Sequence, residues 1–170
     1  MKKKLIFLLL FFITSFQLRA EMSIAYIDMD AIINKSTPGL LIIKEIESIK
    51  KKSESSLLKI EGELKKNEQK LINQKNILSE NEYKTKFLEL RSDIKKYNIK
   101  RANEEKLIRN NYIKMNSNLI KSVQPILIDY SKTNNISFLL QKKNIILGAS
   151  KYDITNDIIK IVNKEIKKIK

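Results

Sequence analysis

Few side chains in this sequence are placed to do chemistry. Asp28 and Asp30 lie two residues apart, and Glu104 and Glu105 are adjacent on a predicted helix that also carries Arg101. Paired carboxylates can act as general acid and base or hold a cation. Here a simpler interpretation is favoured. The aspartates lie where a strand is expected to end and a helix to begin, and the glutamates have cations within reach for ion pairs along a helix.

The sequence contains neither histidine nor cysteine. Without histidine, acid–base catalysis near neutral pH and most zinc or copper sites are disfavoured, and without cysteine disulfides are excluded. Glycine occurs only at Gly39, Gly62 and Gly148, so a glycine-rich phosphate loop is absent. The motifs of serine hydrolases and zinc proteases are absent as well. We therefore predict a protein that is not an enzyme and needs no cofactor or metal.

The first twenty residues have the order of a secretory signal peptide. A basic start is followed by the apolar run Leu5–Ile13, a polar stretch, and Ala20 at a plausible cleavage site. The run is shorter than the ~20 residues that a membrane-spanning helix needs. Leu18 is larger than the small residue usual before the cut, so an uncleaved anchor is the alternative. We predict residues 1–20 to be a signal peptide, and export to the periplasm.

The chain is strongly basic, with a net charge of +15 that falls to +11 when Lys2, Lys3, Lys4 and Arg19 leave with the leader. An excess of basic residues often indicates a protein that binds nucleic acid. Export would separate this protein from nucleic acid, so we predict no nucleic-acid partner. Anionic lipid, lipopolysaccharide and acidic polypeptides remain. The alternative is that lysine simply solvates exposed helices.

Short patterns predict the first elements of a small body. Residues Ser23–Met29 alternate and are rich in β-formers, which predicts a strand. Asp30–Asn34 is expected to form a helical turn. Thr37 can cap a helix that has Pro38 at its first position.

The C-terminal part of the sequence predicts a β-hairpin and a last helix. Ile136–Gln141 and Ile145–Ala149 are expected to be its strands, joined at Lys142–Asn144. Asp153 or Thr155 is expected to cap the helix. That helix would present an apolar face made of Ile158, Ile161, Val162, Ile166 and Ile169.

Between these parts, apolar residues recur every three or four positions, as in a coiled coil diluted by polar residues. The outgoing helix carries Ile42, Ile46, Ile49, Leu57, Ile60, Leu64, Leu71 and Leu78, with Asn67 and Gln74 in phase. Ser79 and Glu82 fit a capping box, which places the tip near Leu78–Asn81. The return helix continues the seam through Arg101, Glu104, Ile108, Tyr112, Met115 and Leu119. Pro125 is expected to kink or break this helix near its end.

Two sets of arm residues are candidates for binding. The apolar stripe on the distal return helix consists of Tyr83, Phe87, Leu90, Ile94 and Tyr97. It can form the hairpin seam, or part of it can stay exposed and grip unfolded polypeptide, and the two readings can coexist. The basic pairs are Lys65 and Lys66, Lys95 and Lys96, and Lys100 and Arg101, which are either solvated surface or a contact for acidic partners.

These elements predict an α+β protein that is predominantly α. A long antiparallel helical hairpin, residues 38–130, is inserted in a small β-containing body of residues 21–37 and 131–170. The body has fewer than about 60 residues, and cores of that size usually need disulfides, a metal or oligomerisation. We therefore expect the body to oligomerise.

The order of elements resembles the Skp (OmpH-like) periplasmic chaperones. The runs that carry the resemblance are Ile24–Met29, Lys100–Glu105, Ile136–Leu140 and Asp153–Thr155. The resemblance implies a homotrimer whose arms enclose a cavity. It also implies a holdase that needs no ATP and keeps unfolded outer-membrane proteins from aggregating. Lys100 and Arg101 match basic positions through which the family contacts lipopolysaccharide, although Leu90 stands where a third basic residue is expected, with Arg91 beside it.

Other functions remain possible from the sequence. A structural envelope adaptor could use the coiled coil to bridge fixed partners, but it would show no preference for unfolded chains. A prefoldin-like cytosolic chaperone also joins β-hairpins to coiled coils, and the leader disfavours it.

Overall fold

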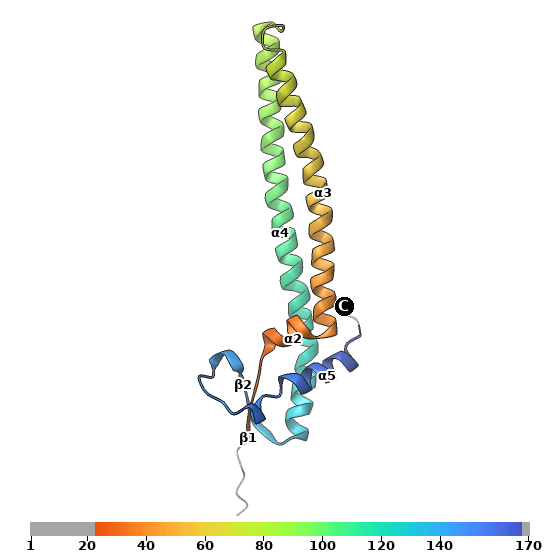
Figure 1. The fold of residues 1–170 in the computed structure, drawn as a ribbon, viewed down its shortest axis with the longest axis vertical. Helices are drawn as coiled ribbons and strands as arrows, with labels where there is room; N and C mark the ends of the chain where they lie inside the picture. Colours follow the sequence, from red (N-terminus) through yellow and green to blue (C-terminus); the bar gives the residue numbers. More distant parts are fainter. Residues whose placement is uncertain (1–22, 168–170) are drawn as a thin grey trace, which may run out of the picture.

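The computed structural model describes residues 23–167 and shows a long helical hairpin rising from a small body (Figure 1). The hairpin consists of helices α3 (Thr37–Asn73) and α4 (Glu80–Thr133). The body contains strands β1 (Ser23–Ile27) and β2 (Ile136–Gln141) and helices α2 (Met29–Lys35) and α5 (Thr155–Glu165). Two 3₁₀ helices, η1 (Lys142–Asn144) and η2 (Ser150–Tyr152), lie between β2 and α5. The predicted fold class is confirmed, whereas the predicted leader lies outside the described residues.

The hairpin seam follows the predicted spacing. On α3, Ile42 and Leu71 are buried, the apolar seam residues between them are half-buried, and the polar seam residue Asn67 is exposed. Ser53, in the gap of the apolar pattern, is also buried. At ~1.5 Å per residue, α3 is about 55 Å long, so the hairpin is an extended arm with a narrow apolar seam.

A serine side chain caps the first turn of each arm helix. Ser79 accepts from the backbone N–H of Glu82, and the Glu82 carboxylate accepts from the Ser79 N–H at 3.0 Å, so the predicted capping box is confirmed. The connection itself spans residues 74–79. At the base of the arm the prediction was one residue late. Ser36, and not Thr37, caps α3, with its hydroxyl accepting from the Gly39 N–H.

Pro125 does not break α4, which continues to Thr133. A proline removes one backbone hydrogen bond and crowds the preceding turn. Its neighbours Val123 and Ile126 are buried in the body core, and that packing holds the helix through the defect. The helix ends at Thr133, and Asn135 just beyond it has a left-handed φ of 52°.

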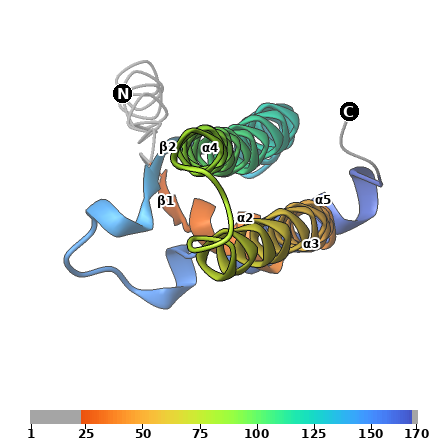
Figure 2. The same cartoon turned by 90° about the horizontal axis from the view of Figure 1, so that it is seen from above.

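The sheet differs from the predicted β-hairpin. β2 runs parallel to β1, with Ile24 beside Phe138 and Tyr26 beside Leu140. The other edge of β1 pairs with the segment before α5, where Tyr26 forms an isolated bridge with Asp153. The prediction that residues 145–149 form a second strand of a hairpin was wrong. Residues 145–149 form no strand, because the chain turns through η1 after β2 and leads away from the sheet (Figure 2).

The body core forms where the arm joins it. Ile32 of α2, Leu119 and Val123 of α4, and Ile158 and Val162 of α5 are fully buried. The predicted apolar face of α5 is confirmed over its described residues, and Ile169 lies outside them. Because Ile42 and Leu119 belong to this core, the base of the hairpin supplies part of the apolar surface that the body needs.

Candidate functional site

The predicted apolar stripe on α4 divides between the seam and the solvent. Tyr83, Leu90 and Tyr97 are half-buried, and the Tyr97 hydroxyl donates across the hairpin to Glu61 Oε2 at 3.4 Å. Phe87 and Ile94 are 44% and 40% exposed. The stripe therefore contributes two apolar side chains to the arm surface, and its role in binding stays a prediction.

A second exposed apolar set on α4 was missed from the sequence. Ile99, Leu107 and Ile113 are 53%, 53% and 59% exposed, and Ile120 lies one heptad beyond Ile113. Ile99, Ile113 and Ile120 are separated by multiples of seven residues, so they share one face of the helix. That seven-residue spacing could have predicted an exposed apolar face. It was overlooked because the apolar pattern of the hairpin seam on the same helix is denser.

Shallow hollows flank this second set. One lies between Ile94 and Ile99, and the next lies between Ile99 and Leu107. Lysine side chains form part of their rims, with Lys95 at the first and Lys96 and Lys100 at the second. An apolar floor with a cationic rim suits weak contacts with apolar side chains and with acidic groups near them.

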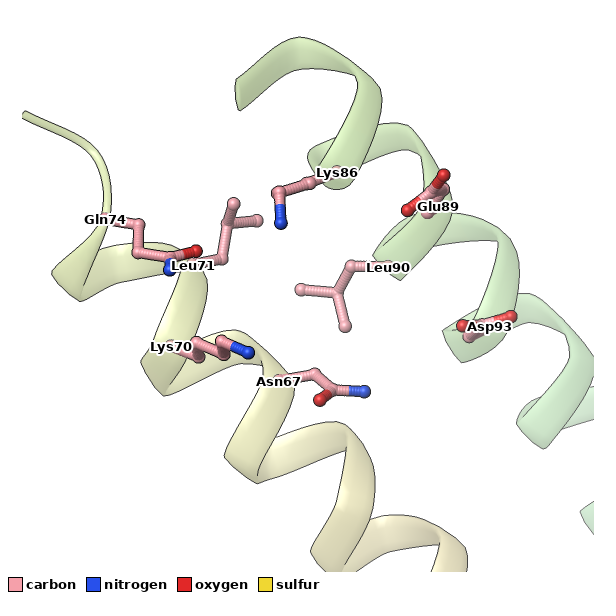
Figure 3. Close-up of a pocket in the computed structure, with 8 residues that line it drawn as sticks. All are labelled: Asn67, Lys70, Leu71, Gln74, Lys86, Glu89, Leu90 and Asp93. Carbon is pink, nitrogen blue, oxygen red and sulfur yellow. The ribbon is translucent and has the colours of Figure 1, made fainter. Parts of the chain in front are cut away.

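A pocket of about 220 Å³ opens between the arms close to the tip (Figure 3). Leu71 of α3 and Leu90 of α4 point toward one another across it. Its remaining lining residues are polar or charged: Asn67, Lys70, Gln74, Lys86, Glu89 and Asp93. The polar seam positions Asn67 and Gln74 fill less of the interhelical space than apolar residues would, which leaves the hairpin loosely packed here.

The predicted basic pairs are distributed along the arm, and some of their charges are already engaged. Lys96 forms an ion pair with Asp93 at 2.8 Å, and Arg101 with Glu105 at 3.2 Å. Lys100 is half-buried and donates to Ser56 Oγ at 3.2 Å, which joins the two helices. The three other predicted cations, Lys65, Lys66 and Lys95, are exposed.

The body carries a separate exposed apolar surface. Ile146 and Leu147, in the segment between η1 and η2, are fully exposed, and Phe138 and Leu140 of β2 are 54% and 44% exposed. Ile24, the β1 neighbour of Phe138, is 46% exposed on the same sheet. Large exposed apolar side chains that gather in one part of a protein often mark a site of protein–protein contact.

Polar contacts hold the segment that carries Ile146 and Leu147. The Tyr26 hydroxyl donates to the Ala149 carbonyl at 3.2 Å, and Lys142 forms an ion pair with Asp153 at 2.7 Å. Asp153 also accepts from the Thr155 N–H at 3.0 Å. The prediction that Asp153 or Thr155 caps α5 was wrong, because the residue at the cap position is Ile154, whose side chain cannot accept a hydrogen bond. The Thr155 hydroxyl in turn accepts from the Asp28 N–H. These contacts fix both ends of the segment on the body.

The Asp153 contact predicts a pH-dependent stability. Burial raises the pKa of Asp153, but hydrogen bonds from Lys142 and Thr155 outweigh it and hold the pKa below its ordinary value of 3.8. The carboxylate therefore adds stability above that value, and the contribution is lost as the pH falls through the lowered folded-state pKa. Asp153→Asn should cost about 1 kcal/mol at neutral pH.

Urea unfolding of both proteins in steps from neutral pH to below about pH 3 would measure this difference, which should shrink toward zero in acid. Asp93→Asn is the matched control, because its ion pair with Lys96 is exposed and should contribute little. A difference at Asp153 that persisted unchanged in acid would show that the carboxylate charge is not its source.

Metal-binding clusters and membrane-spanning helices are both absent from the residues that the structure describes. No group of three or more carboxylates is arranged there to hold a metal ion. Within residues 23–167, no helix has both the length and the apolar character to cross a membrane.

Comparisons with known proteins agree with the fold. The family model described as Outer membrane protein (OmpH-like) matches residues 23–162. A solved structure of a candidate outer membrane chaperone (OmpH-like) from Caulobacter crescentus CB15 superposes with a TM-score of 0.81. Its sequence is 14% identical, and the match covers 87% of this chain and 88% of that one, which at such identity shows the fold alone. No curated protein matches this sequence.

Proposed function

This chain belongs to the OmpH-like outer membrane protein family, and we propose that it is a periplasmic holdase. It binds unfolded outer-membrane proteins after export and keeps them from aggregating, without ATP. The observation that carries the proposal is the apolar surface on α4, where Ile99, Leu107 and Ile113 are exposed and other apolar residues such as Phe87 and Ile94 are exposed nearer the tip. Exposed apolar side chains mark a contact surface when they gather on one element, as they do along α4.

The distribution of these side chains suits a client without a fixed fold. Ile99 and Ile113 share one helix face, Leu107 lies to one side of it, and lysines lie between them, so no single hollow can hold a whole client. Many weak contacts give strong retention when they act together on one chain. The charge of the arm favours acidic segments of the client.

We further propose that three copies assemble through the apolar surface of the body, so that three arms surround the client. The segment with Ile146 and Leu147 and the outer face of β2 would be covered in this assembly. The same arrangement would multiply the contacts available to one client.

The test is the aggregation of a denatured outer-membrane β-barrel protein diluted into buffer without nucleotide. Light scattering is recorded with increasing amounts of the chain, and the mass of the chain is measured in parallel. The wild-type protein should suppress scattering at about three chains per client, as the trimer would require. A well-folded oligomer that fails to suppress it would reject the holdase and favour a structural adaptor.

A triple variant, Ile99→Ser with Leu107→Ser and Ile113→Ser, should weaken client binding by at least about tenfold, because three partly buried side chains would lose apolar contact. The matched control is Ile99→Leu with Leu107→Ile and Ile113→Leu, which keeps the apolar area and alters the shape. Non-selective holding predicts that the control behaves as wild type. Loss in both variants would instead indicate a shape-specific partner.

A further inference from the structure

The side of α4 that is turned away from α3 repeats the spacing of a coiled-coil seam. Tyr97 faces α3, where its hydroxyl donates to Glu61, and Ile99 lies two residues further on, which places it on the opposite side of the helix. Exposed residues recur on that side every three or four positions: Leu88, Arg91, Lys95, Ile99, Ala102, Lys106, Arg109 and Ile113. We call this set the outer face of α4. Its members are apolar or basic, and none is acidic.

The cations of the outer face have no acidic partner within the described residues. None of them forms an ion pair there, whereas Lys96 and Arg101, on other sides of α4, both do. Apolar side chains at seam spacing with cations between them are complementary to a second helix that carries apolar side chains and acids. The outer face therefore has the properties of an unoccupied contact between helices.

Helix α3 carries the complementary pattern on one exposed side. Its glutamates recur there at intervals of seven residues: Glu47, Glu54, Glu61 and Glu68. Leu58 and Ile72 each follow one of them by four residues, so they lie on the same side of the helix, and they are 66% and 57% exposed. We call this set the glutamate line of α3. Lysines alternate with it, and their long side chains can turn to the solvent: Lys44, Lys51 and Lys65.

The contacts within the hairpin show which residues of the two helices lie at the same height above the body (Figure 1). Tyr97 is level with Glu61, and Lys100 is level with Ser56. Because the helices are antiparallel and rise equally, each step up α3 corresponds to an equal step back along α4.

By this count, the outer face and the glutamate line match in height. Each glutamate is within about one helical turn of the level of one cation, and the pairs are Glu47 and Arg109, Glu54 and Lys106, Glu61 and Lys95, and Glu68 and Arg91. Leu58 is likewise level with Ile99, and Ile72 with Leu88. Within one copy these groups do not meet, because the outer face is turned away from α3.

Neighbouring copies in the trimer proposed above would bring the two patterns together. Copies related by rotation about an axis along the arms hold their arms at equal heights. We propose that the outer face of α4 packs on the glutamate line of α3 from the next copy, which closes the arms when no client is bound. This inference rests on the proposed assembly and adds its regulation, since the client and the neighbouring arm compete for Ile99 and Ile113.

The strength of such a contact suits a gate that a client can open. Exposed ion pairs are individually weak and are screened by salt. The body holds the copies together, so weak contacts between arms act at a high effective concentration. The closed arrangement is then populated without a client, and a client that binds only the open arrangement shifts the population toward it.

Disulfide formation tests the contact directly, because the sequence contains no cysteine. Glu61→Cys with Lys95→Cys should link copies under mild oxidation, since a disulfide needs Cβ atoms within about 4.5 Å. The matched control is Glu63→Cys with Lys95→Cys. Glu63 is exposed at nearly the same height, but it lies two residues from Glu61 and therefore on another side of α3.

The first pair should give linked dimers and trimers in high yield, and the control should give few. About 1 M salt should lower the yield of the first pair, because it screens the ion pairs. Equal yields from the two pairs, or no links from the first, would overturn the proposal.

The mass of the reduced proteins separates this inference from the assembly on which it rests. A trimeric mass without links from the first pair would reject the contact between arms and leave the assembly standing. A monomeric mass would reject both.

Linked arms test the competition with a client. The oxidised first pair should suppress aggregation of the denatured β-barrel protein at least about tenfold less well than the same protein after reduction. Full suppression by the linked protein would show that arm closure does not regulate client binding. Linked arms together with a reduced protein that fails to suppress aggregation would instead reject the holdase and leave the contact between arms in place.

Removal of the negative charges should favour the open arms. Glu54→Gln with Glu61→Gln should raise the apparent affinity for a client about threefold, because a larger fraction of the protein is then open. Glu45→Gln with Glu63→Gln removes the same charge from another side of α3 and should change the affinity much less. An equal change in both variants would show a general effect of charge, and no change in either would contradict the gate.

Discussion

Replacing Gly39 by alanine should destabilise the protein by about 3 kcal/mol or more, in the range of severe overpacking. A Cβ built at Gly39 would overlap the carbonyl oxygen of Ile33, a backbone atom that cannot rotate aside. Gly39 lies in the first turn of α3, where α2 ends and the chain reverses through the Ser36 cap. Relief would require moving α2, whose Ile32 is fully buried in the core.

Gly62 provides a control in the same helix with the opposite expected sign. A Cβ there would meet nothing within 4 Å, so Gly62→Ala should stabilise the protein by up to about 1 kcal/mol through helix propensity. Thermal and urea unfolding followed by circular dichroism would measure both variants. If Gly39→Ala also stabilised the protein, the tight approach of α2 to α3 would be wrong.

Local signals in the sequence were sufficient for much of this fold. The capping box of Ser79 and Glu82 depends on residues three positions apart, and it was predicted correctly. The strand Ile136–Gln141 was predicted with the bounds that it has, because β-forming residues are followed directly by a lysine-rich turn. The 3–4 spacing likewise located the hairpin seam, since residues in phase on a helix share one face.

Features that depend on distant partners were not predicted. The sequence contains two apolar segments in 136–149, and a hairpin is their simplest local pairing. The structure instead pairs β2 with β1, more than a hundred residues earlier, in parallel. A short apolar run such as Ile145–Leu147 has the same sequence pattern whether it forms a strand or an exposed segment that binds a partner.

The apolar residues of the candidate site were only partly predicted, again because their exposure depends on a distant element. A stripe at 3–4 spacing covers a wide sector of a helix, and a single partner helix covers only the middle of it. Tyr83, Leu90 and Tyr97 lie on the line that faces α3, whereas Phe87 and Ile94 lie to one side. The exposed line through Ile99 and Ile113 becomes distinct only when the position of α3 is known.

The exposed segment of the body leads to the prediction with the largest effect on assembly. Ile146→Asp with Leu147→Asp should convert the proposed oligomer to a monomer. Full burial of an isoleucine or leucine side chain contributes about 1.5–3 kcal/mol, so losing both should weaken association at least about a hundredfold per copy. The aspartates would also bring like charges together around a symmetry axis.

The fold of the single chain should survive this change. Neither side chain contributes to the body core, and the contacts of Tyr26 and of Lys142 with Asp153 that hold the segment involve other residues. Circular dichroism should therefore show unchanged helicity, while sedimentation or light scattering shows the mass of one chain. Leu58→Asp with Ile113→Asp, two exposed apolar residues on the arm, is the matched control and should keep the wild-type mass.

The two outcomes separate assembly from client binding. If a folded monomer no longer suppresses aggregation although its α4 surface is intact, retention of the client depends on several arms acting together. A monomer that suppresses aggregation fully would place the binding activity within one arm. A variant that keeps its oligomeric mass would show that Ile146 and Leu147 are not in the interface. The next apolar surface of the body to test would then be the outer face of β2, with Phe138 and Leu140.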